Sequence, residues 1–195
     1  MPIECYRELL DKADREEKER GRTWYADAHK SALKIAAETG STVEKAVGVI
    51  AVLSPMVEWN VNLKAARLFL RSKGKAKRGI PGFATNRRKA KEVMKGNFEV
   101  IRGPKVRAFF ETLLDPEHPE PVIDTQMIAA FYDGTAYRDD FRIVSQSKKR
   151  LEPIREAVKL LAEERGEPVS QVQATIWITF KRTKSEYANQ LKLWR

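Results

Sequence analysis

A lysine and an aspartate, each at the start of a predicted helix, are the residues of this chain best placed to do chemistry. In the segment RGPKVRAFFETLLDPEHPEPVIDTQMIAAF (residues 102–131), Gly103 and Pro104 open a helix with Lys105 in its first turn. Proline suits the first helical position because the N–H that it lacks would go unpaired there. Asp124 precedes a second helix, whose free N–H groups its carboxylate can cap. The 19 positions that separate the lysine from the aspartate allow both side chains to reach one cleft.

The same segment resembles the signature of the helix-hairpin-helix DNA glycosylase superfamily, the group of endonuclease III and 8-oxoguanine glycosylase. That signature reads L-P-G-x-G-x-K-x-A, then an apolar helix, then V-D-x-H, and Gly103, Lys105, Val106 and Asp124 fall on it. The resemblance implies that Lys105 attacks the sugar C1′ as a neutral amine and that Asp124 stabilises positive charge and assists proton transfer. Taken singly, a lysine at a helix start is usually a solvated charge, and an aspartate there is usually only a cap.

The chain departs from this signature before Gly103, where the first glycine of the pattern is missing. In the family the hairpin grips phosphates through backbone N–H groups, which position the protein on the duplex. The hairpin of this chain is therefore expected to be short or remodelled.

A second match lies in V-I-A-V-L-S-P-M-V-E-W-N-V-N-L-K-A, which resembles the family line V-L-L-S-A-Q-A-T-D-x-x-V-N-K-A without a gap from Leu53 to Ala65. Met56 stands where family members place a glutamine that wedges into the base stack. Methionine can also wedge between bases, although it cannot hydrogen-bond to the opposite base. The alternative is that Met56 belongs to the core.

The charge of the chain favours a polyanionic partner. The net charge is +10 and the pI is about 9.7, and a basic surface of this kind attracts nucleic acid. A solvated lysine face or an anionic protein partner would give the same composition. Many of the basic residues cluster between residues 71 and 88, and a smaller group lies at residues 148–150. The predicted nucleic-acid contacts are Met56, Arg71, Lys73, Lys75, Lys77, Arg78, Arg87, Arg88, Gly103 and Arg107.

The chain has few of the residues that a disulfide, a metal site or an iron–sulfur cluster requires. Cys5 is the only cysteine, which excludes an internal disulfide and a four-cysteine iron–sulfur cluster. His29 and His118 are the only histidines, so we expect no metal site, and we expect no cofactor. No run approaches the roughly 18 apolar residues of a membrane span, and the N-terminus lacks a secretory signal. We therefore expect an intracellular, cytoplasmic protein without a membrane partner, nucleoid-associated if it is bacterial or phage-encoded.

Helical signals recur along the chain, and only VIRG and PVID look extended. Thr23 is expected to cap one helix, and Ser41 with Glu44 has the spacing of a capping box before an apolar run that should be buried all round. Gln173 lies four residues before Trp177, so it either lines a pocket or is a satisfied core amide. The polar tail, residues 183–195, is expected to be loosely held. The predicted helices span approximately residues 2–20, 24–38, 42–54, 58–71, 85–95, 104–114, 125–131, 145–165 and 168–182.

These observations predict an all-α, two-lobed, glycosylase-like domain with a central cleft. All 195 residues should form one domain, with a family-like core at residues 42–131 and closing helices within 1–40 and 145–182. The expected function is N-glycosidic cleavage with β-lyase capability on a nucleotide flipped out of duplex or single-stranded DNA. One alternative is a glycosylase-fold enzyme of phage DNA base hypermodification. Another is a non-catalytic DNA-binding protein.

Overall fold

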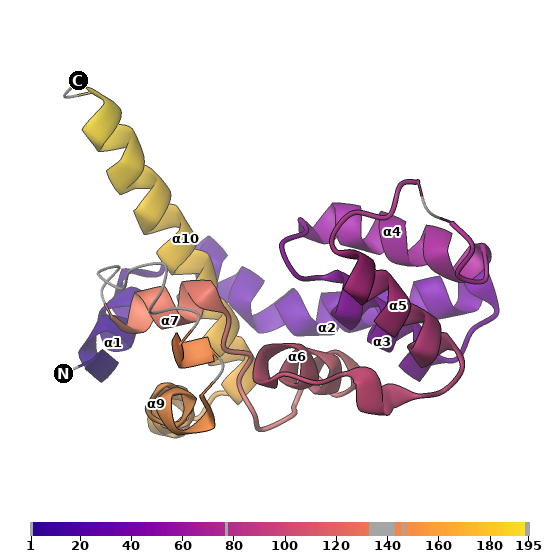
Figure 1. Ribbon diagram of the computed structural model, residues 1–195. Coiled ribbons are helices and arrows are strands. Elements are labelled where there is room, and N and C mark those ends of the chain that lie inside the picture. Colours follow the sequence, from indigo (N-terminus) through magenta and orange to yellow (C-terminus); the bar gives the residue numbers. More distant parts are fainter. Residues whose placement is uncertain (1, 77, 133–142, 146, 194–195) are drawn as a thin grey trace. The chain divides into compact units, whose positions relative to one another are not determined.

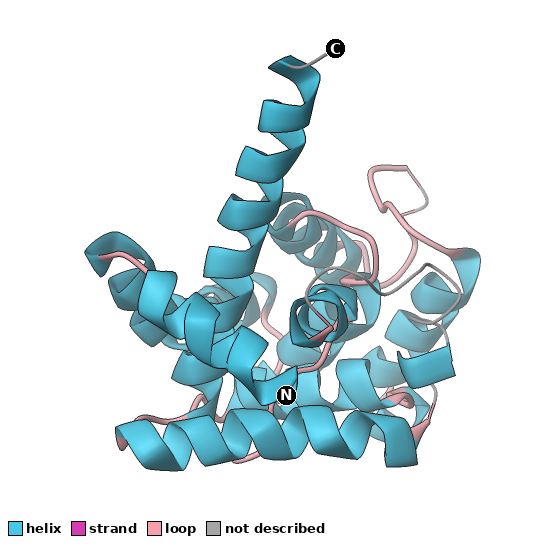
Figure 2. Ribbon diagram, turned by 90° about the vertical axis from the view of Figure 1, so that its left-hand side faces the viewer, coloured by secondary structure: helices cyan, strands magenta, loops and turns pink. Residues whose placement is uncertain are grey.

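The computed structural model describes residues 2–76, 78–132, 143–145 and 147–193, and in these ranges the chain forms helices and loops without a strand (Figure 1; Figure 2). The predicted all-α class is confirmed. None of the described helices is long and apolar enough to cross a membrane. The predicted turn and loop at 133–142 lie outside the described residues. The helices are α1 (Pro2–Lys12), α2 (Arg15–Thr39), α3 (Val43–Leu53), α4 (Trp59–Arg71), α5 (Ala84–Met94), the 3₁₀ turn η1 (Phe98–Val100), α6 (Pro104–Leu114), α7 (Thr125–Phe131), α9 (Lys148–Arg165) and α10 (Val169–Leu193).

The chain divides into two compact units. We call residues 26–116 the central unit, after their place in the sequence, and residues 1–25 with 117–195 the terminal unit. Each unit is described by itself below. That all 195 residues fold as one cooperative domain stays a prediction.

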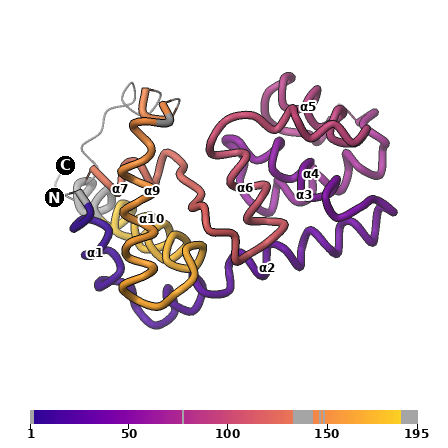
Figure 3. Tube along the Cα trace, turned by 90° about the horizontal axis from the view of Figure 1, so that it is seen from below, coloured from indigo at the N-terminus to yellow at the C-terminus, as the bar shows by residue number. Residues whose placement is uncertain are grey.

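Helix α3 is the buried centre of the central unit. Every residue from Ala46 to Leu53 is buried, as the apolar run predicted. Helices α4, α5 and α6 all pack against α3 (Figure 3). Gly48 permits the close approach of α5, because a Cβ at this position would lie only 2.6 Å from Cγ1 of Val93. Helices α4, α5 and α6 are therefore held close against α3.

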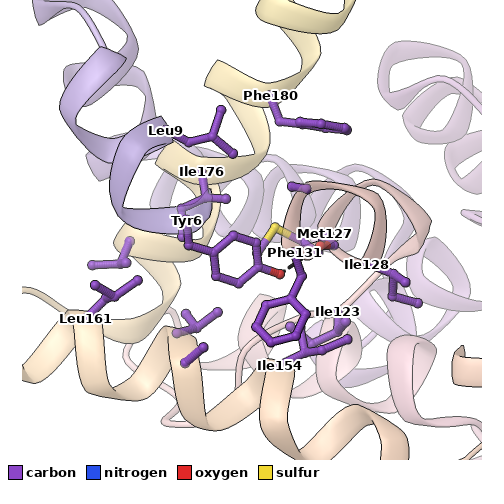
Figure 4. Packing of buried hydrophobic residues seen from close by; sticks show 14 of the residues in the cluster. Tyr6, Leu9, Ile123, Met127, Ile128, Phe131, Ile154, Leu161, Ile176 and Phe180 are labelled. Carbon is purple, nitrogen blue, oxygen red and sulfur yellow. Dashed lines mark hydrogen bonds between the residues drawn. The ribbon is translucent and has the colours of Figure 1, made fainter. Parts of the chain in front are cut away.

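The terminal unit is built around an aromatic residue from its first helix. Tyr6 of α1 is fully buried and donates a hydrogen bond to the carbonyl oxygen of Met127 in α7, at 2.7 Å (Figure 4). Its ring meets Phe131 edge-to-face at 5.4 Å. Burial raises the pKa of the Tyr6 phenol well above its usual value, and the charge of Asp124 adds to this effect. Apolar side chains of α9 and α10, such as Ile154 and Ile176, complete this core.

The break between the first two helices differs from the prediction, which placed a cap at Thr23. Helix α2 runs through Thr23 and begins at Arg15. Asp14 and Glu17 cap this start reciprocally: Oδ1 of Asp14 accepts from Glu17 N (2.8 Å), and Oε2 of Glu17 accepts from Asp14 N (3.2 Å). Gly21 stays helical inside α2, since a Cβ there would lie 1.9 Å from Oγ1 of Thr175. The glycine therefore serves close helix packing and does not end a helix.

The start of α2 is also tied to α10 by an ion pair between a buried glutamate and a half-exposed arginine. Arg182 donates to both carboxylate oxygens of Glu17, from Nε at 2.7 Å and from Nη2 at 3.0 Å. The Arg182 hydrogen bonds lower the pKa of Glu17 below its ordinary value. Charge-assisted bonds of this bidentate kind are stronger than neutral ones and specify geometry.

One further prediction needs correction. The cap of α3 is Thr42, whose hydroxyl accepts from Lys45 N at 3.3 Å, whereas Ser41 is hydrogen-bonded to Thr39. The polar tail is helical as far as Leu193, and that it is loosely held stays a prediction. Gly166 ends α9, as predicted, and takes the left-handed conformation (φ 61°).

Candidate functional site

Lys105 lies at the start of α6, in the central unit. Gly103 is the N-cap, with φ 102° and no side-chain cap, a conformation that glycine adopts without strain. Half-buried Lys105 donates from Nζ to Oγ of Ser54 at 3.4 Å, and the same Nζ lies 5.4 Å from the ring centroid of Phe109. A ring face attracts a cation at this range. The amine is thus held between a hydroxyl at the end of α3 and an aromatic ring of α6.

The chain that follows Ser54 makes a tight turn. Val57 N donates to the Ser54 carbonyl oxygen at 3.1 Å, and Met56 has φ 62°. Pro55 followed by a residue with positive φ is the pattern of a type II turn, in which glycine or asparagine normally takes the third position. Met56 is 92% exposed, so the alternative that it belongs to the core is wrong. A long apolar side chain is held in solvent by a backbone conformation that costs about 1 kcal/mol for a residue with a Cβ.

A second exposed apolar side chain stands next to this turn. Phe83 precedes α5 and is 62% exposed. A Cβ on Gly82 would lie 3.8 Å from Cγ2 of Val57, so the loop that carries Phe83 touches the turn that carries Met56. Phe83 was not among the residues predicted from the sequence. The feature that could have revealed it is an aromatic residue that stands between glycines and the basic pair Arg87-Arg88.

The entire net charge of the chain belongs to the central unit. Residues 26–116 contain 18 lysines and arginines against 8 aspartates and glutamates, which gives +10. The terminal unit contains 19 of each kind and is neutral. Any long-range attraction of a polyanion therefore acts chiefly on the unit that carries Lys105, Met56 and Phe83.

Some of the predicted nucleic-acid contacts are committed to protein partners. Arg71 pairs with Glu38, and Arg107 pairs with Glu111 and lies over Phe110. Arg87 donates to two loop carbonyl oxygens, those of Ile80 and Gly82.

The other predicted cations of this group are better placed to meet an anion. Lys73, Lys75, Arg78 and Arg88 are exposed and form no ion pair within the part of the chain that the structure describes. Lys77 lies outside the described residues. The basic cluster of the sequence thus consists of cations that support the loop and cations that an incoming phosphate could pair with.

Asp124, in the terminal unit, caps α7 as predicted. Its Oδ1 accepts from the backbone N–H groups of Gln126 and Met127, both at 2.9 Å, and its Oδ2 accepts from Nε1 of Trp177 at 3.0 Å. Three donors therefore fix the carboxylate. Lys105 and Asp124 belong to different units, and that both reach one cleft stays a prediction.

Aromatic groups lie near Asp124. Gln173 is a satisfied core amide, since it is 4% exposed and accepts from the Tyr25 hydroxyl at 2.6 Å. Burial raises the pKa of Tyr25, and the charge of Asp124 raises it further. Trp177 carries Nζ of Lys181 4.2 Å from its ring centroid, and both side chains line a pocket of about 350 Å³ between α2 and α10. Among the described residues, no group of three or more His, Cys, Asp or Glu side chains is placed to hold a metal ion.

Comparison with protein families covers most of both units. A family model matches residues 6–184, which include every candidate residue. The chain belongs to the family of unknown function DUF7178. No curated protein and no solved structure matches the chain. For this DUF7178 chain the geometry of the site therefore carries the argument about function.

The turn of the DUF7178 chain generates a prediction that separates backbone strain from side-chain function. Met56→Gly should raise the free energy of unfolding by about 0.5–1 kcal/mol, because glycine relieves the positive φ. Met56→Ala keeps the strain and loses an exposed side chain, so its stability should stay within about 0.5 kcal/mol of wild type. The wedge hypothesis further predicts that both variants lose more of a DNA-processing activity on paired DNA than on mismatched or single-stranded DNA, whose bases are already partly unstacked.

Urea melts and activity assays on the three kinds of DNA measure these effects. Leu68→Ala is the matched control, since Leu68 is a partly exposed apolar residue of the same unit. Wild-type activity of Met56→Gly on paired DNA would show that the side chain has no wedging role.

Proposed function

We propose that this DUF7178 chain is a DNA base-processing enzyme of the helix-hairpin-helix glycosylase type, with N-glycosylase and abasic-site lyase activity on a flipped nucleotide. The observation that carries the proposal is the placement of the Lys105 amine, held by the Ser54 hydroxyl and the Phe109 ring at the start of α6. An amine that acts as nucleophile has to be held at one point, since orientation supplies a large part of the catalysed rate.

In the proposed reaction the Lys105 amine bonds to the sugar C1′, and the bond from C1′ to the base breaks. The base leaves with the electron pair and takes up a proton. The new ammonium nitrogen then loses a proton, the bond from C1′ to the ring oxygen O4′ breaks, O4′ takes up a proton, and a Schiff base forms. Removal of a C2′ proton then breaks the bond from C3′ to oxygen by β-elimination, and the 3′ phosphate leaves with the electron pair. These steps use only the lysine and proton transfers, so the proposal needs no metal or cofactor.

Asp124 is the proposed partner of this lysine across a cleft between two lobes. A carboxylate fixed by two backbone N–H groups and the Trp177 indole is a preorganised negative charge. Such a charge stabilises positive charge that develops on the sugar without reorganising during the reaction.

The surface of the central unit suits DNA as the substrate. Its charge of +10 and the exposed side chains of Lys73, Lys75, Arg78 and Arg88 favour the phosphate backbone, which dominates affinity. Met56 and Phe83 offer apolar side chains that can enter a base stack opened by flipping. We propose that the two act on the same stretch of DNA, because the loops that carry them touch.

One observation favours a divergent reaction as the second candidate. Only the 3₁₀ turn η1 stands between α5 and α6, where the glycosylase family forms the first helix of its hairpin. An enzyme that modifies bases in phage DNA, rather than excising them, would fit such a remodelled anchor. A DNA-binding protein without catalysis is the third.

Borohydride trapping tests the proposal. Wild-type protein incubated with abasic, uracil, 8-oxoguanine and thymine-glycol duplexes should form a covalent adduct with at least the abasic DNA. Lys105→Gln should abolish the adduct with little effect on folding or DNA affinity, whereas Lys64→Gln, an exposed lysine of the same unit, should keep it. Asp124→Asn should slow trapping and also lose up to about 1 kcal/mol of stability through its cap.

Two results together would overturn the lyase reading. These are the absence of an adduct with any abasic DNA and wild-type behaviour of Lys105→Gln in every assay. An intact DNA affinity would then favour modification or plain binding.

A further inference from the structure

The Ser54 hydroxyl is held in place from several sides. Its backbone N donates to the Ala51 carbonyl oxygen at 3.3 Å, and its own carbonyl oxygen accepts from Val57 N at 3.1 Å. Its Oγ donates to the same Ala51 oxygen at 2.9 Å. Pro55, which follows, restricts the backbone further. These bonds fix the position of the hydroxyl oxygen, and its hydrogen is given to the Ala51 carbonyl oxygen.

This arrangement makes Ser54 an acceptor toward Lys105. A serine hydroxyl has a single hydrogen, and that hydrogen is given to Ala51. The 3.4 Å contact with Nζ of Lys105 therefore has the lysine as donor. An N–H is available for such a bond in both the ammonium and the amine form of the lysine, so the contact survives loss of the proton.

The Phe109 ring defines a second direction around the same nitrogen. Phe109 lies one helical turn after Lys105, is 6% exposed and meets Trp59 edge-to-face with ring centroids 6.4 Å apart. Its ring is therefore a packed wall. The Ser54 hydroxyl and the Phe109 ring thus restrict where the Lys105 nitrogen can lie.

We infer that Ser54 is a positioning residue for Lys105, one that holds the amine before and after it loses its proton. The catalytic part of this inference rests on the proposed function, whereas the hold on the amine does not. In the reaction the lone pair forms the bond from Nζ to C1′, while the base departs with the electrons of the glycosidic bond. Ser54 neither gains nor loses a proton in this step, because its hydrogen stays on Ala51.

Labelling without DNA tests the hold on the amine. The full chain is treated briefly with formaldehyde and cyanoborohydride, and the methylation of Lys105 is compared with that of Lys64 in the same sample by peptide mass spectrometry. Ser54→Ala should raise the ratio by about threefold or more, the factor that one hydrogen bond of ordinary net strength provides. Ser54→Thr keeps the acceptor and should restore the wild-type ratio. Ser54→Cys keeps the size of the side chain but offers only a weak acceptor, so it should behave like Ser54→Ala. It takes the place of Ser54→Ala in the test if that variant does not fold.

Trapping on abasic duplex tests the catalytic part. Ser54→Ala should lower the maximal trapping rate by about tenfold while the DNA concentration at half-saturation stays unchanged, and Ser54→Thr should recover the rate. An unchanged labelling ratio in folded Ser54→Ala and Ser54→Cys would overturn the inference. A changed ratio with no trapping by wild-type protein would support the hold on the amine and refute the proposed function.

Discussion

The burial of α3 on all sides is the constraint on which the central unit depends. Three helices pack against it, and Gly48 allows α5 to come so close that any side chain at this position would collide with Val93. The candidate groups sit at the ends of these packed helices: Ser54 and Met56 follow α3, and Lys105 begins α6. A contact between a serine and a lysine 51 positions apart is thereby set by the rigid core rather than by either loop. Sites built on rigid elements in this way hold their geometry better than sites on loops alone.

The same rigidity explains how a strained turn can persist. Met56 keeps a positive φ because Pro55 and the hydrogen bond from Val57 to Ser54 determine the turn around it. Strain of this kind costs stability, and backbone outliers gather at functional sites. In the terminal unit, an aspartate is held in one orientation by a backbone N–H group at the start of a helix and by an indole N–H. Each unit thus presents one preorganised charged group, and the proposed function gives both a role.

Local signals in the sequence predicted much of this structure. Pro104 and Gly103 marked the start of α6, Asp124 capped α7, and the apolar run was the buried helix. Features that depend on distant partners could not be predicted. The cap expected at Thr23 is wrong because α2 continues through Gly21, which allows a close contact with Thr175 that no local pattern reveals. The sequence also could not separate the cations, because whether an arginine is committed depends on a carbonyl or carboxylate that only the fold brings near. The relation of Lys105 to Asp124 stays a prediction for the same reason.

Peptide mapping of the borohydride-trapped complex tests the central claim most directly. Wild-type protein is reduced onto an abasic duplex, the DNA is digested, and the modified peptide is located by mass spectrometry. The account predicts a single modified residue, Lys105. A sugar remnant on the N-terminal amine, or spread over the exposed lysines of the basic loop, would contradict it.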